Sequence, residues 1–166
     1  MVRIKRVPQE GLRIQAKMET PQRVTVRAGE KAIKLDTPEL LGGGGRGMMP
    51  LEALLGAYAG SLNLVGNFVA KTMDFDLKNW EFTIWAEFDP RGIYGLAKVP
   101  KALLTVHLEA RVATPETPRR LNELRKRLAE RDPVHNLLKI AGVRIREKWD
   151  IVAPDGSGAK AQKKSN

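Results

Sequence analysis

The chain has no cysteine among its 166 residues and only two histidines. The lack of cysteine excludes a disulfide framework, a CxxC redox motif and a cysteine-ligated zinc site. It also excludes thiol chemistry by the chain itself, because the reactive species there is a cysteine thiolate. Two histidines leave little material for a metal site, so we expect neither a metal nor another cofactor.

Aromatic residues are also few, at 5% of a chain whose formal net charge is +10. A basic surface attracts nucleic-acid phosphates. However, the positive residues lie near the amino terminus, in segment 119–131 and near the carboxyl terminus, with no aromatic residues between them to stack on bases. We interpret them as a solvated basic surface and do not expect nucleic acid as a partner.

No apolar block occurs in the first thirty residues, so we see no signal or transit peptide and expect a cytoplasmic protein. Asparagine and glutamine are few while charged residues are plentiful, a balance typical of thermophiles. Length and a 42% hydrophobic content favour one domain. Gly, Ser and Lys dominate from Pro154 onward. We therefore predict a single domain over 1–152 and a disordered basic tail over 153–166.

Alternating apolar and polar residues, the period of a half-buried strand, mark most of the predicted strands. An Ala-Gly-Glu turn at 28–30 predicts that the second and third form a hairpin. His107 falls on the polar face of its strand, where a surface or packing role is usual. Pro118 opens an amphipathic helix that ends at Asp132-Pro133. The strands are expected at 12–18, 24–26, 33–35, 80–88, 104–112 and 143–151.

A long apolar helix is expected to begin at Pro50, after a glycine-rich approach, and to run to about residue 70. It is long enough to cross a bilayer, which takes about 20 apolar residues. However, Glu52, Asn63 and Asn67 interrupt it, and a single span would leave the strands on both sides unexplained. We therefore expect a helix buried on most faces, which a second subunit would cover. The apolar residues are Leu51, Leu54, Leu55, Tyr58, Ala59, Leu62, Val65, Phe68 and Val69.

Familiar catalytic motifs are incomplete. Ser61 follows a glycine but lacks the second glycine of a nucleophile elbow, and it lies in the middle of the predicted helix. The loop 42–47 could cradle an anion, but it lacks the Gly-Lys-Ser/Thr ending of a phosphate-binding loop. A hinge or close-packing role suits that loop better.

Three short segments resemble the OsmC/Ohr family, the osmotically inducible and organic hydroperoxide resistance proteins. They are 38–43 (PELLGG), 49–62 (MPLEALLGAYAGSL) and 132–138 (DPVHNLL). The resemblance implies an α+β fold with antiparallel sheets around a long buried central helix, assembled as an intertwined homodimer. It also implies reduction of organic hydroperoxides by two cysteines. Ser61 and Asp132 stand at the two cysteine positions, so the family's thiol route is excluded here.

The family site also uses a glutamate and an arginine. Glu52 is the candidate carboxylate, although Leu51 occupies the position where some members place it. A first-turn carboxylate that is favoured by the helix dipole explains Glu52 equally well. The candidate arginines are Arg23 and Arg27.

We regard these residues, with Ser61, Asp132 and Tyr58, as candidates for a pocket at the dimer interface. The leading hypothesis is that the pocket binds a small apolar molecule. The alternatives are an enzyme in which Asp132 or Glu52 is a general base, or a stress-response module that binds a protein partner.

Overall fold

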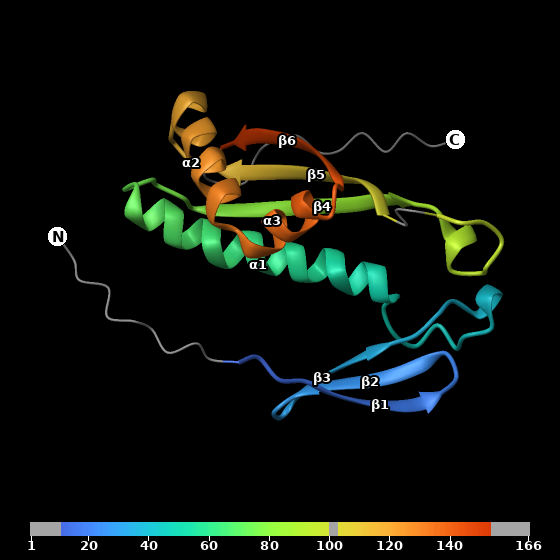
Figure 1. Ribbon diagram of the computed structural model, residues 1–166. Coiled ribbons are helices and arrows are strands. Elements are labelled where there is room, and N and C mark those ends of the chain that lie inside the picture. The colour runs from blue at the N-terminus through green and yellow to red at the C-terminus, as the bar shows by residue number, and fades with distance from the viewer. Residues whose placement is uncertain (1–10, 100–102, 154–166) are drawn as a thin grey trace. The chain divides into compact units, whose positions relative to one another are not determined.

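The computed structural model describes residues 11–99 and 103–153 (Figure 1). The chain divides into two compact units, residues 1–54 and 55–166. Almost all of the predicted basic tail, from residue 154 on, lies outside the described residues. The single domain predicted over 1–152 stays a prediction.

The first unit holds an antiparallel sheet in the order β1-β2-β3, with β1 at Gln15–Thr20, β2 at Arg23–Ala28 and β3 at Lys31–Leu35. The predicted hairpin is confirmed. Its turn contains Gly29 at φ +62°, a conformation that glycine adopts at little steric cost. β1 begins later than expected, because Gln15 already pairs with Arg27, near the end of β2.

The glycine-rich loop is built around the buried carboxylate of Asp36. This carboxylate accepts backbone N–H groups of Thr37, Gly44 and Arg46 at 2.9, 3.3 and 3.1 Å. Desolvation raises the pKa of Asp36, but the three backbone donors outweigh it and hold the pKa below its ordinary value. A Cβ on Gly43 would lie 1.9 Å from the carbonyl oxygen of Thr37. The glycines thus serve close packing, and the chain's own carboxylate takes the N–H groups that an anion would need. A short 3-10 helix, η1 at Glu39–Leu41, directly precedes the loop.

Helix α1 spans Pro50–Thr72 and begins at the predicted proline. It is long and apolar enough to cross a membrane by length and composition, a property that core helices of soluble proteins share. Within one chain part of its apolar surface is uncovered, since Leu64 and Phe68 are 59% and 62% exposed. Its buried residues are Tyr58, Leu62, Gly66, Val69 and Ala70.

The second unit contains a sheet in the order β4-β5-β6, with β4 at Asn79–Phe88, β5 at Leu103–Ala113 and β6 at Arg144–Val152. β4 and β5 are antiparallel, as predicted. β6 departs from the predicted antiparallel pairing, because it runs parallel to β5. The physical reason is the helical connection between these two strands, which carries the chain back before β6 begins. Another short 3-10 helix, η2 at Pro90–Gly92, follows β4.

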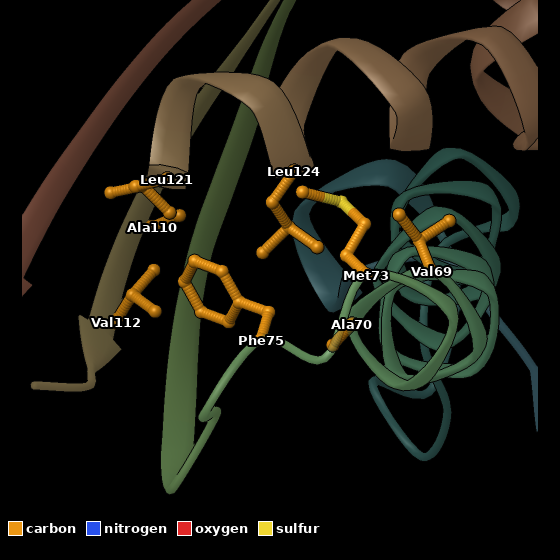
Figure 2. Packing of buried hydrophobic residues seen from close by; sticks show 8 residues of the cluster. All are labelled: Val69, Ala70, Met73, Phe75, Ala110, Val112, Leu121 and Leu124. Carbon is orange, nitrogen blue, oxygen red and sulfur yellow. The ribbon is translucent and has the colours of Figure 1, made fainter. Parts of the chain in front are cut away.

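That connection is formed by α2 at Pro118–Arg131 and α3 at Pro133–Ile140. The predicted apolar stripe of α2 is buried, and the segment after Asp132 forms a further helix of eight residues. Figure 1 shows α1 running along the sheet of β4, β5 and β6. Figure 2 shows the core cluster between α1, α2 and this sheet, which consists of Val69, Ala70, Met73, Phe75, Ala110, Val112, Leu121 and Leu124.

The other face of this sheet is polar. It carries His107, as predicted, with its ring stacked on that of Trp85 at a centroid distance of 4.8 Å. His107 Nε2 lies 3.0 Å from a carboxylate oxygen of Glu87. These contacts agree with a surface and packing role for this histidine.

Candidate functional site

A buried polar cluster joins α1 to α3. The hydroxyl oxygen of Tyr58, on α1, lies 2.8 Å from Nδ1 of His135, on α3. Tyr58 is fully buried, and His135 is 5% exposed. Tyr58 lies on the same side of α1 as Leu62 and Val69, which are also buried. The buried apolar residues of α1 therefore place the Tyr58 hydroxyl against α3, where the imidazole of His135 is its polar partner.

Asp132 is the second member of the cluster and is fully buried. It ends α2 and caps α3, because its Oδ1 accepts the backbone N–H of His135 at 2.8 Å. Pro133 follows at the first helical position, where its missing N–H costs nothing. The second carboxylate oxygen, Oδ2, is buried and has no hydrogen-bond partner among residues 11–99 and 103–153. One oxygen is thus committed to the fold, while the other is left without a donor.

Glu147 supplies a second carboxylate from the sheet. On β6 it lies in the half-buried series Ile145, Glu147, Trp149 and Ile151, which alternates with exposed residues. One of its oxygens accepts the indole N–H of Trp149 at 3.1 Å and lies 3.7 Å from Nε of Arg125. The other lies 3.8 Å from Nδ1 of His135. A carboxylate therefore faces the imidazole from the sheet side.

Burial controls the ionisation of this cluster. It raises the pKa of Tyr58 far above its ordinary value, and the nearby carboxylates of Glu147 and Asp132 raise it further. Burial also lowers the pKa of His135, and although the charge of Glu147 opposes that shift, the net pKa is below the usual value. At neutral pH the phenol is therefore protonated and the imidazole is neutral.

This ionisation predicts a loss of stability in mild acid. Because the pKa of His135 is lower in the folded chain, the unfolded chain takes up its proton first as the pH falls below about 6.5. The free energy of unfolding should then fall steadily until the pH passes the folded pKa. Urea unfolding at pH 7.5, 6.5 and 5.5 measures it.

The His135→Gln variant should lose most of this fall between pH 6.5 and 5.5. His107→Gln is the matched control and should keep it, since His107 lies on the polar sheet face. An equal fall in the wild-type protein and in His135→Gln would show that His135 is not its source.

Of the candidates from the sequence, Tyr58 and Asp132 are brought together through His135. Ser61 lies on α1 one turn after Tyr58 and is half-buried. It stands between the buried stripe of α1 and its exposed apolar residues Leu64 and Phe68.

The other three candidates belong to the first unit. Glu52 accepts the backbone N–H of Met49 at 2.8 Å, which agrees with the structural explanation of this first-turn carboxylate. Nε of Arg23 lies 3.2 Å from the carboxylate of Glu19, and Arg27 is exposed on β2.

Sequence reasoning missed His135 and Glu147. His135 was inside one of the segments that carry the resemblance, but nothing in the pattern showed its partner. Glu147 had a signal, because it interrupts a series of apolar residues at every second position of its strand, Ile145, Trp149 and Ile151.

The family model for OsmC-like proteins matches residues 42–148, which include Tyr58, Ser61, Asp132, His135 and Glu147. No curated protein matches the chain. An OsmC-like protein from Mycoplasma pneumoniae is 19% identical, with a TM-score of 0.75, over 87% of this chain and 99% of that one. An organic hydroperoxide resistance protein OsmC from Legionella pneumophila is 18% identical, with a TM-score of 0.64, over 87% of this chain and 98% of that one. A third similar structure is a putative organic hydroperoxide resistance protein from Vibrio cholerae with captopril bound in one of its active sites. It is 18% identical, with a TM-score of 0.64, over 88% of this chain and 94% of that one.

Proposed function

Because this chain belongs to the OsmC-like protein family and has no cysteine, we propose that it binds a small, largely apolar ligand and is not a thiol peroxidase. The proposed pocket is bordered by Ser61, Tyr58 and Asp132 and is closed by a second copy of the chain. Proteins of the family are soluble, and a cytoplasmic location is part of the proposal.

The observation that carries the proposal is the unpartnered oxygen of Asp132 inside the buried cluster. A buried polar atom without a partner costs free energy, so folds retain few of them without a reason. A ligand that donates a hydrogen bond to this oxygen is such a reason. The captopril bound to the Vibrio cholerae protein supports a site of this kind, because it shows that a protein of similar fold holds a small molecule.

The second copy is proposed from the surface of α1. Leu64 and Phe68 are largely exposed, and a Cβ on Gly56 or Gly60 would meet no atom within 4 Å. Exposed apolar side chains beside glycines suit the close approach of another helix. Covering this surface would also enclose the half-buried Ser61 and give the apolar part of a ligand a place to lie.

An acid–base enzyme is the second candidate function. The hydrogen bond between Tyr58 and His135 favours it, because it links two groups that can each transfer a proton. In such an enzyme Asp132 would be the general base and Ser61 would position the substrate.

Organic hydroperoxides should not be consumed faster with this protein than in buffer, even with a dithiol reductant present. The family reaction needs a thiolate that is oxidised to a sulfenic acid and then to a disulfide, and neither serine nor aspartate can follow that path. Loss of cumene hydroperoxide, followed by a colorimetric peroxide assay, measures it. Turnover that follows the purified protein through gel filtration would contradict the proposal.

A neutral apolar dye should bind saturably to the folded protein. We expect Nile red fluorescence to rise on titration, and Ser61→Trp should reduce its affinity by about tenfold or more, since a large side chain would fill the pocket. Thr83→Trp places the same residue on the polar sheet face and should leave binding unchanged. Equal dye affinity for both variants would show that the pocket is not beside Ser61.

A further inference from the structure

We propose that the ligand carries a primary ammonium group and that this group binds to Oδ2 of Asp132. This inference rests on the proposed function, because it names the chemical class of the ligand for the same site. The starting observation is that Oδ2 is buried and that no donor in the described ranges reaches it. A carboxylate oxygen in that position needs a donor from outside the chain.

The hydrogen bonds of the groups in this cluster go to atoms other than Oδ2 of Asp132. The hydroxyl of Tyr58 is paired with His135, and the backbone N–H of His135 is held by the other oxygen, Oδ1. The indole N–H of Trp149 donates to the carboxylate of Glu147, and the guanidinium of Arg125 lies beside the same carboxylate. Among residues 11–99 and 103–153, no donor forms a hydrogen bond with Oδ2.

The charge of the cluster favours a cation as that donor. Asp132 and Glu147 bring two carboxylates close to Tyr58 and His135, and the charges of both act on these two groups. Arg125 lies beside Glu147, and the positive charge of Lys139 acts on His135, but neither forms an ion pair with Asp132 in the structure. An anionic ligand would meet an unneutralised carboxylate, whereas N⁺–H donors form the strongest hydrogen bonds to one.

The enclosure of Oδ2 limits the size of the head group. Asp132 is completely buried, so any head group that reaches Oδ2 has to displace neighbouring side chains, and a planar guanidinium or a quaternary ammonium would displace more of them than a primary ammonium. A primary ammonium is compact and has three donors, which suits one enclosed oxygen. The apolar part of the ligand would then extend past Ser61 toward Leu64 and Phe68.

The test uses three probes with one six-carbon chain: n-hexylammonium, n-hexanol and n-hexanoate. Isothermal titration of the wild-type protein should show n-hexylammonium binding at least about tenfold more tightly than n-hexanol, with n-hexanoate weakest. A tenfold ratio corresponds to about 1.4 kcal/mol, close to the lower end of the roughly 1.5 to 3 kcal/mol that a hydrogen bond to a charged group contributes.

Asp132→Asn is the informative variant. Asparagine keeps an acceptor for the backbone N–H of His135 and is a good helix cap, so α3 should stay folded. The advantage of n-hexylammonium over n-hexanol should fall below about threefold, with n-hexanol affinity unchanged. Glu109→Gln removes one negative charge from the polar sheet face and is the matched control, which should keep the wild-type ratio. If Asp132→Asn does not fold, the ratio of n-hexylammonium to n-hexanol affinity in the wild-type protein alone tests the ammonium site.

The outcomes separate the two proposals. Equal affinity of n-hexylammonium and n-hexanol for the wild-type protein would overturn the ammonium site, as expected if a buried water satisfies Oδ2, while the apolar pocket would stand. Tighter binding of n-hexanoate than of n-hexylammonium would also overturn the ammonium site. If none of the three probes binds and Nile red does not bind either, the proposed function fails, and the ammonium site fails with it.

Discussion

A variant with both Ser61→Cys and Asp132→Cys is expected to oxidise to an internal disulfide. Tyr58, one turn before Ser61, touches His135, and the backbone N–H of His135 is bound by Asp132. The two positions therefore lie on surfaces that already contact each other, and a disulfide needs Cα atoms about 4.4 to 6.8 Å apart. The bond would close a loop of roughly seventy residues, which in the chain-entropy account stabilises by about 4 kcal/mol. Loss of the Asp132 cap would offset about 1 kcal/mol.

Free thiols can be counted without background, because the native chain has no cysteine. Mass spectrometry after thiol alkylation should find no free thiol in the oxidised double variant and two after reduction. A pair of Ser61→Cys with Thr83→Cys is the control and should keep two free thiols. Two free thiols in the double variant after mild oxidation would show that the alignment is wrong at one or both positions.

Most secondary structure could be predicted from the sequence because period-two alternation and the residues that start and end helices are local signals. Pro50 and Pro118 open helices as expected, and the segment 80–88 is a strand. The direction of β6 was not predictable in this way. Parallel pairing follows from where α2 and α3 return the chain, and the periodicity of β6 is the same in either direction.

The candidate site was predictable only in part. Ser61 and Asp132 emerged from a resemblance, which compares positions and therefore gives no contacts. The cluster depends on contacts between residues far apart in the chain, such as Tyr58 with His135, which no spacing rule reveals. Glu147 marks a limit of reasoning from periodicity. A charged residue among inward-facing positions of a strand indicates either that the strand is wrongly assigned or that the residue has a buried partner.

The exposure of α1 revises how dimer formation should be tested. We expected the helix to be buried on most faces once a second subunit covers it. Within one chain Leu62 is only 2% exposed, so a charge there damages the core whether or not a dimer exists. Leu64 and Phe68 are on the exposed side, so changes there affect association without disturbing the core.

The wild-type protein is therefore expected to be a homodimer, and Phe68→Glu is expected to be a folded monomer. Phe68 is 62% exposed within one chain, so covering that exposed part contributes about 1 to 2 kcal/mol, and a two-fold interface loses two such contributions. The dimer dissociation constant should thus rise by about twentyfold or more, at 1.4 kcal/mol per tenfold. Asn122→Glu introduces the same charge on an exposed position of α2 and should leave the dimer intact. Sedimentation velocity at micromolar concentrations gives the mass, and circular dichroism shows that the helices remain. A wild-type protein that sediments as a folded monomer would refute the dimer, and with it the idea that a second copy closes the pocket beside Ser61.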